Sequence, residues 1–210
     1  MLEFNGCGTV AKAIRRGFLN LLPDQTDKHF TARLLKLLKM INLNDVEGIR
    51  GKRSVIISAS RPILMKIVFN VLQDVAEMTQ DEFICSHSIS RADATMKLTD
   101  FKLKPILIPE GANYFRIQNH LSVVSDYNYS ETTRCYEPVD VFNGKSAFIY
   151  SEYTPVDTAL TADLKAAFPE GTLVGEEVSI LECAGIEFYQ KVGANYLPLK
   201  GSSMMMVDVF

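Results

Sequence analysis

The chain contains no tryptophan, only four cysteines and no long apolar run. The longest apolar stretches, at 54–60 and 63–72, are broken by polar residues and fall short of the ~20 residues that a membrane-spanning helix needs. The cysteines stand singly, at Cys7, Cys85, Cys135 and Cys183. This spacing predicts free thiols, with two disulfides as the alternative for a secreted protein. Because no apolar segment with a small-residue cleavage site follows Lys12, we expect a cytoplasmic protein without a membrane contact.

Sequence motifs that carry catalysis or ligand binding are also lacking. The Gly-Cys-Gly stretch at 6–8 has neither a preceding strand nor the fuller glycine spacing of a phosphate-binding loop. Cys85 and His87 would share one face of a strand, but no further metal ligand stands at a diagnostic spacing. No serine has the flanking glycines of a nucleophile elbow, and neighbouring carboxylates such as Glu176 and Glu177 would face opposite sides of a strand. We therefore predict a protein that is not an enzyme and that holds no metal and no cofactor.

Charge is abundant but unevenly divided. Residues 1–70 hold 12 Lys and Arg against 5 Asp and Glu, a balance of +7. Residues 71–210 hold 10 against 20, a balance of −10, which brings the whole chain to −3. A basic segment joined to an acidic body predicts a contact with something negative, either an external polyanion or the body itself.

Two amphipathic helices are expected in the basic segment. Over residues 8–22, apolar side chains recur every three to four positions, opposite Lys12 and Arg16. Asp27 is a suitable N-cap for a second helix over residues 28–41, which has a leucine-rich face and a basic face. The simplest arrangement of these two helices is a hairpin.

Beyond residue 52 the apolar period changes from 3.6 to 2, which predicts strands. We expect them at residues 54–60, 63–70, 114–129, 147–153, 178–192, 196–199 and 204–210. The segment 114–129 alternates most clearly, which predicts one buried and one solvent-facing side, with a possible break near Asn119. Residues 161–168 are the only late helix expected, and residues 74–81 form either a helical turn or a loop.

These patterns predict an α+β, mainly β fold. Residues 46–210 would form an antiparallel β-sandwich body, and residues 1–45 a basic amphipathic helical hairpin packed on it. No linker rich in Gly, Ser or Pro separates the two parts, so we expect one continuous domain. The methionine-rich terminal strand would be an edge on which a second chain can pair.

The basic helix face is the candidate contact site. Arg33, Lys36 and Lys39 follow at i, i+3 and i+6, from which they would track phosphates in a salt-sensitive manner. The same pattern is typical of any solvated helix face, and no aromatic side chain interleaves to stack on bases. The candidate contacts to a polyanion or a partner are Arg15, Arg16, Arg33, Lys36, Lys39, Lys52 and Arg53.

Several stretches resemble, in order along the chain, an uncharacterised family of hypothetical proteins from Bacteroidetes. In that family a basic helical segment precedes an Arg-Gly-x-Arg stretch and a strand that ends in Phe-Asn. The matching stretches are 13–16 with Leu19, 32–38, 50–53, 67–70, 111–117, 188–189 and 196–199. The resemblance implies a β-rich body behind a basic helical segment and a mobile-element or phage-like origin, and it implies no activity.

Together these features predict a non-enzymatic structural or interaction protein that associates with itself, as a homo-oligomer, or with another protein. Head-to-body association of copies would close a ring or extend an array. The alternative is a nucleic-acid-associated protein that uses the basic helices. A third interpretation is a carbohydrate- or peptide-binding sandwich that uses exposed tyrosines, which we expect at Tyr127, Tyr129, Tyr136 and Tyr153.

Overall fold

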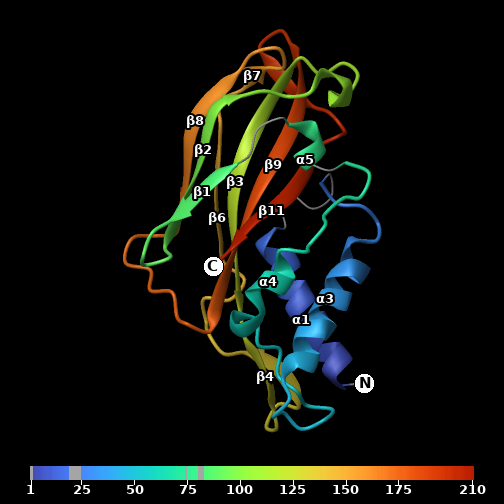
Figure 1. Ribbon diagram of the computed structural model, residues 1–210, viewed down its shortest axis with the longest axis vertical. Coiled ribbons are helices and arrows are strands. Elements are labelled where there is room, and N and C mark those ends of the chain that lie inside the picture. Colours follow the sequence, from blue (N-terminus) through green and yellow to red (C-terminus); the bar gives the residue numbers. More distant parts are fainter. Residues whose placement is uncertain (1, 19–24, 74, 80–82) are drawn as a thin grey trace.

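The computed structural model describes residues 2–18, 25–73, 75–79 and 83–210, and it consists of three stacked layers (Figure 1). A helix pair covers one face of a large central sheet, and a smaller sheet covers the other face. All strand pairings in these sheets are antiparallel. The predicted α+β, mainly β class, with N-terminal helices on an antiparallel β body, is confirmed.

The helices of the described residues are α1 (Leu2–Gly17), α3 (Phe30–Asn44), α4 (Arg61–Leu64) and α5 (Val75–Met78), with 3-10 turns η1 (Ser58–Ser60) and η2 (Pro105–Leu107). The strands are β1 (Ile84–His87), β2 (Asp93–Phe101), β3 (Tyr114–Ser125), β4 (Tyr127–Ser130), β5 (Cys135–Pro138), β6 (Ser146–Tyr150), β7 (Thr154–Pro155), β8 (Leu160–Ala167), β9 (Val178–Val192), β10 (Asn195–Pro198) and β11 (Ser203–Val209). None of these helices has the length and apolar content needed to cross a bilayer.

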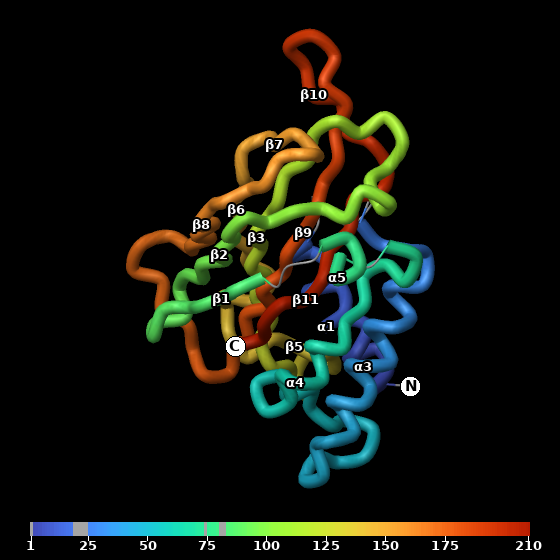
Figure 2. The backbone as a smooth tube through the Cα atoms, turned by 45° about the horizontal axis from the view of Figure 1, so that its top comes forward, coloured from blue at the N-terminus to red at the C-terminus, as the bar shows by residue number. Residues whose placement is uncertain are grey.

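The central sheet has the order β10-β9-β3-β6, with β11 also paired to β9 and β7 to β3. Strands β3 and β9 form its spine, in register from Tyr114 opposite Tyr189 to Ser125 opposite Val178. The small sheet has the order β1-β2-β8, and β4 and β5 form a separate hairpin beyond the end of β3. The β9–β10 hairpin projects beyond the rest of the molecule at the opposite end (Figure 2).

The helix pair packs through the apolar stripes expected from the sequence. Val10, Ile14 and Phe18 of the first stripe are fully buried against the central sheet. However, α1 begins at Leu2, well before the predicted residue 8, and the predicted positions 19–22 lie outside the described residues. At its other end, Gly17 lies so close to β3 that a Cβ there would come within 1.9 Å of the Ser122 hydroxyl. The absence of a side chain at position 17 therefore sets the close approach of helix to sheet.

The prediction that Asp27 is the N-cap of the second helix is wrong in detail. The N-cap position of α3 is His29, which makes no side-chain capping bond. Asp27 lies two residues earlier, where its Oδ1 accepts the His29 backbone N–H at 2.7 Å and both its oxygens accept from Arg33. The carboxylate thus orders the turn into the helix and also binds the first turn of the helix itself.

Three of the predicted elements are wrong. Residues 54–70 do not form the two predicted strands and contain only single-residue bridges at Val55 and Val68. The turn η1 and the helix α4 lie between these bridges, because Pro62 starts a short helix. Most apolar side chains of residues 54–70 are nevertheless buried in the core beneath the helix pair, whereas Met65 and Val68 remain exposed. Residues 161–168 form β8 rather than a helix, since pairing with β2 overrides the helix propensity of their Ala, Leu and Lys. The break in 114–129 falls at Asp126, not near Asn119.

The predicted solvent-facing side of β3 is buried instead. Gln118, His120 and Ser122 are at most 3% exposed, because α1 lies over this face of the sheet. The opposite face, with Phe115 and Ile117, packs on the small sheet. Both faces of the central sheet are therefore interior in its middle part, and surface function is left to the outer side of the helices and to the sheet ends.

Candidate interaction surface

The seven cations expected to make the contact do not act together. Arg33 binds both Asp27 oxygens at 2.9 Å and also donates to the carbonyl oxygens of Val68 and Phe69. These bonds hold the pKa of the Asp27 carboxyl well below its usual range. Arg33 is thus a structural clamp between α3 and the segment that follows α4, and it is not available to a polyanion.

Two of the lysines are also neutralised by carboxylates of the same chain. Lys39 Nζ donates to the Glu3 carboxylate at 2.6 Å and to the Asn42 side chain as well. The bond from Lys39 lowers the pKa of Glu3. Lys52 forms an ion pair with Glu131 of the β4–β5 hairpin. The first pair joins α3 to α1, and the second joins the segment after α3 to the turn between β4 and β5.

Arg53 is a backbone partner rather than a surface cation. Its carbonyl oxygen accepts from the Asn42 amide at 2.8 Å and from the Tyr136 hydroxyl at 2.8 Å. Its Nε is buried and has no partner among the described residues. Arg53 is thus only partly exposed, and the contacts that fix this position are made by its carbonyl oxygen.

Three of the predicted cations do remain exposed, together with one that the prediction left out. Arg15 and Arg16 on α1 and Lys36 on α3 point to solvent, and so does Lys12. Within the described ranges none of the four has a carboxylate within 4.0 Å. Lys12 belongs to the same stripe as Arg16 in the sequence, and that periodicity was the available signal for it.

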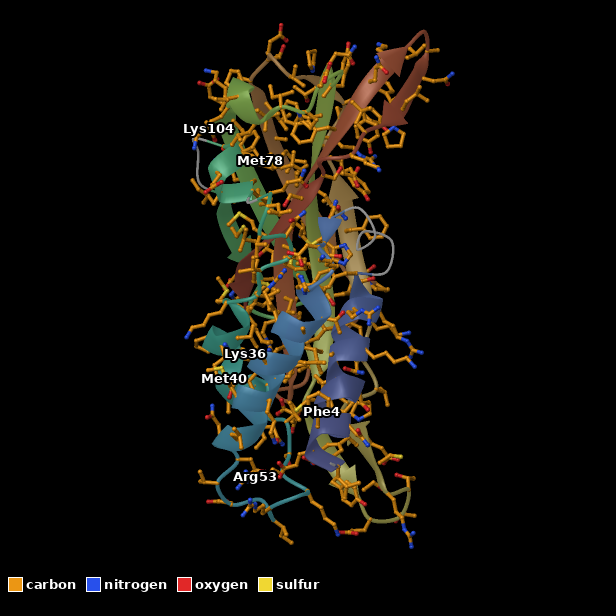
Figure 3. All side chains as sticks on the ribbon, turned by 90° about the vertical axis from the view of Figure 1, so that its right-hand side faces the viewer. Phe4, Lys36, Met40, Arg53, Met78 and Lys104 are labelled. Carbon is orange, nitrogen blue, oxygen red and sulfur yellow. The ribbon has the colours of Figure 1, made fainter. Side chains whose placement is uncertain are left out.

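These cations flank a groove between the two helices on the side away from the sheet, which we call the α1–α3 groove. It consists of two adjoining hollows of about 450 and 470 Å³ that share Leu35. The first is lined by Gly8, Ala11, Lys12, Arg15, Arg16, Thr31 and Leu35. The second is lined by Phe4, Ala32, Leu35, Lys36, Lys39, Met40 and Leu43. Figure 3 views this face, with Phe4 on α1 and Lys36 and Met40 on α3 labelled.

The groove changes character along its length. At one end it is basic, through Lys12, Arg15 and Arg16. At the other end Phe4 and Leu43 remain 57% and 50% exposed, although they are large apolar side chains. Exposed apolar side chains that gather beside uncompensated charge are typical of a binding surface rather than of a plain solvated helix face.

The tyrosines proposed as a ligand platform are placed differently. Tyr127 and Tyr136 are buried, so the prediction that they are exposed is wrong. Tyr153 belongs instead to a cluster at the end of the central sheet, with Tyr114, Tyr150, Tyr189 and Tyr196.

Within this cluster the ring faces are filled by the chain's own side chains. Tyr153 and Tyr196 stack with 3.9 Å between their centroids, and the Arg116 guanidinium lies 3.7 Å from the Tyr150 centroid. Arg116 also bonds Glu187 at 2.7 Å. The cluster is therefore best understood as packing that stabilises the sheet end.

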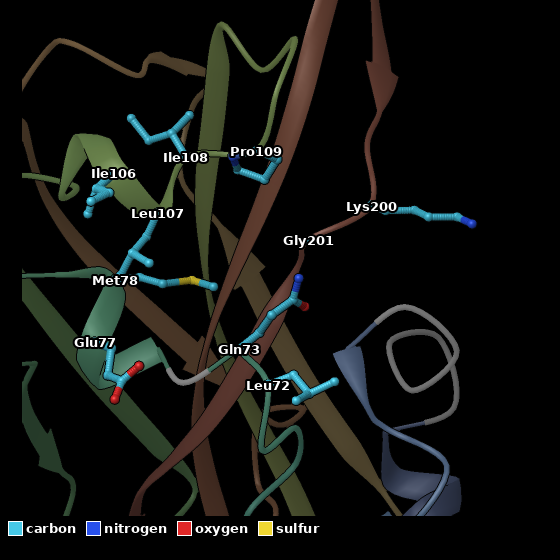
Figure 4. Close-up of a pocket in the computed structure, with 10 residues that line it drawn as sticks. All are labelled: Leu72, Gln73, Glu77, Met78, Ile106, Leu107, Ile108, Pro109, Lys200 and Gly201. Atoms are coloured by element: carbon cyan, nitrogen blue, oxygen red, sulfur yellow. The ribbon is translucent and has the colours of Figure 1, made fainter.

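A further hollow, of about 350 Å³, lies beside α5 and η2 (Figure 4). Its lining is mainly aliphatic, with Met78, Leu107 and Ile108 among its residues. The two charged residues of the lining, Glu77 and Lys200, lie on opposite sides of it in the figure. Such an arrangement does not bring an acid and a base together on one reacting atom.

No catalytic or metal-binding constellation is found in the described part of the chain. It contains no group of three or more His, Cys, Asp and Glu side chains suited to a metal ion. The ring of His87, one of the two residues considered as ligands, stacks on Phe210 at 4.0 Å. Within the same residues no Ser or Cys side chain bonds a histidine ring, the contact that activates a nucleophile.

Two buried ionisable side chains lie on opposite faces of the central sheet. Glu182 is fully buried toward the small sheet, beside Asn119 and Cys85, and burial raises its pKa to about 7. His120 is buried toward the helices, where its Nε2 lies 2.7 Å from the Gly17 carbonyl oxygen, and burial lowers its pKa to about 4. Neither side chain reaches solvent, so both belong to the interior rather than to a site.

Comparison with protein-family models, with curated proteins and with solved structures finds no match.

Proposed function

We propose that this protein is a non-enzymatic interaction protein that binds an acidic partner through the outer face of its helix pair. The observation that supports the proposal is the group of four cations, Lys12, Arg15, Arg16 and Lys36, which have no carboxylate partner among the described residues. Arg33, Lys39 and Lys52 are paired with carboxylates of the chain, and Arg53 is only partly exposed. Of the seven predicted cations, Arg15, Arg16 and Lys36 are therefore the exposed and unpaired ones, and all three lie on this face.

The partner is either another protein or a second copy of this chain. Residues 71–210 carry −10, so the body of a second copy has the required sign of charge. Charge attraction of this kind acts over a Debye length of about 8 Å at physiological ionic strength and weakens as salt is added. Association of either type is therefore expected to be sensitive to salt.

Nucleic acid is the less favoured partner. Three of the seven cations assigned to phosphate contact, Arg33, Lys39 and Lys52, are bound to carboxylates. In one half of the groove the exposed apolar side chains of Phe4, Met40 and Leu43 lie beside Lys36, which suits a protein partner better than a phosphate backbone.

The test combines solution mass with binding to defined probes. Absolute mass is measured by light scattering behind size exclusion, at low and at high salt, for the wild type and for the double variant Arg15→Glu/Arg16→Glu. Polyglutamate and a single-stranded oligonucleotide are then titrated onto both proteins. The matched control is Lys66→Glu/Lys145→Glu, which changes net charge equally at exposed positions away from the groove.

A discrete oligomer that dissociates in salt and in the Arg15/Arg16 variant identifies the partner as a second copy. A monomer that binds polyglutamate, with binding lost only in that variant, identifies it as another molecule. Tighter binding of the oligonucleotide would replace the proposal with the nucleic-acid alternative. If the Arg15/Arg16 variant and the control behave alike toward every probe and in mass, the proposed surface is wrong.

A further inference from the structure

We infer, on the basis of the function proposed above, that the α1–α3 groove receives an acidic amphipathic helix from a different protein. Three features of the groove lead to this occupant: its length and openness, the order of charge and apolar side chains along it, and the absence of free backbone groups on its walls.

The groove has the dimensions of a helix site. Its lining on α1 runs from Phe4 to Arg16, which at 1.5 Å per residue corresponds to roughly 18 Å, or a little over three helical turns. Midway along, a Cβ built on Gly8 meets no atom within 4 Å, so the space above this glycine is open. A third helix can therefore approach the pair closely at this point.

The side chains are ordered in a way that matches an amphipathic helix. Phe4, Met40 and Leu43 offer apolar contact at one end, and Arg15 and Arg16 offer positive charge at the other. A helix with apolar residues along one stripe and Asp or Glu flanking it toward one end would satisfy both. Charge complementarity makes the occupant acidic, because the lining contains Lys12, Arg15, Arg16 and Lys36 without an ion-pair partner among the described residues, and it contains no Asp or Glu.

The walls of the groove are helices, and this excludes an extended strand as occupant. The backbone groups of α1 and α3 are bonded along each helix, so they offer no row of donors and acceptors with which a strand could pair. A helix satisfies its own backbone and needs only side-chain contact. Bases are equally unsuited, since Phe4 is the only aromatic side chain in the lining.

A second copy of this chain does not provide such a helix within its described residues. Outside the pair its helices are α4 and α5, of 4 residues each, about a single turn. The occupant is therefore assigned to another protein.

The experiment uses synthetic peptides and variants of the full chain. One fluorescent peptide of about four turns carries leucines at i, i+3, i+4 and i+7 with flanking glutamates, and a second has the same composition in scrambled order. Gly8→Leu fills the groove, whereas Gly8→Ala changes the same position and leaves most of the space open. Both substitutions replace a helical glycine with a better helix former, so neither is expected to lower the melting temperature.

We expect the amphipathic peptide to bind the wild type at least tenfold more tightly than the scrambled peptide. Gly8→Leu should weaken that binding at least tenfold, and Gly8→Ala should leave it within about twofold. Equal binding of the two peptides, or an unchanged affinity in Gly8→Leu, overturns the helix as occupant. In that case a loss of polyglutamate binding in Arg15→Glu/Arg16→Glu still upholds the proposed function, and the absence of that loss rejects it as well.

Discussion

At the scale of single residues, Glu182 and His120 give the central sheet two buried protonation sites with opposite behaviour. Glu182 keeps its proton in the folded state up to a pKa of about 7, above the ordinary 4.5, so its contribution to stability falls as pH rises between these values. His120 stays neutral in the folded state down to a pKa of about 4, below the ordinary 6.5, so its contribution falls as pH drops through that range.

In their shared pH window the two effects oppose each other. Between pH 4.5 and 6.5 the folded chain holds the Glu182 proton and the unfolded chain holds the His120 proton, so the proton count of these two groups does not change on unfolding. We therefore expect the free energy of unfolding of the wild type to be nearly independent of pH there. Urea unfolding at several pH values measures this directly.

The variants Glu182→Gln and His120→Asn should separate the two contributions. Without Glu182, the free energy of unfolding should rise from pH 4.5 to 6.5 by about 2 kcal/mol, because only the histidine then titrates. Without His120 it should fall over the same range by a similar amount. Slopes of the same sign in the two variants, or two flat profiles, would show that these groups are not buried as described.

At the scale of elements, α1 is held against β3 at one tight contact. Gly17→Ala would bring a Cβ to 1.9 Å from the Ser122 Oγ and 2.9 Å from its Cβ, so helix and strand would have to separate. We expect a loss of about 1–3 kcal/mol in the free energy of unfolding. In a Ser122→Gly background the nearest of these atoms would be the Cα, at 3.6 Å, so the same substitution should cost much less. Urea unfolding of the four proteins in this double-mutant cycle measures the difference, and additive effects would contradict the contact.

The elements also show which patterns in a sequence predict structure. The strand over 178–192 was predicted with its observed bounds, because its apolar side chains alternate and each face meets a different layer. The alternation of 114–129 was equally clear, yet its polar face is buried by a helix distant in sequence. Residues 54–70 show the converse, since apolar content indicates burial and not the form of the backbone.

From the sequence, the candidate surface could be predicted only as a set of basic side chains on the helices, without their partners or their surroundings. The basic face of the helices was visible in the periodicity, but the neutralisation of Lys39 and Lys52 depends on carboxylates 36 and 79 residues away. No local pattern identifies such partners. The groove itself arises from the antiparallel packing of two helices, which leaves Phe4 beside Met40 and Leu43. The tyrosine cluster was missed for the same reason, as its members come from separate strands.

At the scale of the whole molecule, the helix pair and the β body share one core. Side chains of α1 and α3, such as Ile14 and Leu38, pack with Leu181 of β9 and with Met204 and Met206 of β11. On the other face of the same strands lies the second core, which joins the central sheet to the small sheet. Residues 1–45 therefore cover apolar surface that residues 46–210 cannot cover alone.

We accordingly expect the chain to unfold in a single transition. Far-ultraviolet circular dichroism reports the helices together with the sheets, and tyrosine fluorescence, undisturbed by tryptophan, reports largely on the sheet end that holds the tyrosine cluster. In urea the two signals should have the same midpoint, because loss of the helices exposes one face of the central sheet and removes its support.

A fragment of residues 46–210 should fail to give a cooperative transition for the same reason. Separate midpoints in the full chain, or a cooperatively folding fragment, would show that residues 1–45 are an appendage. The hydrogen bonds that Arg33 donates to the carbonyl oxygens of Val68 and Phe69 would then be too weak to couple the two parts.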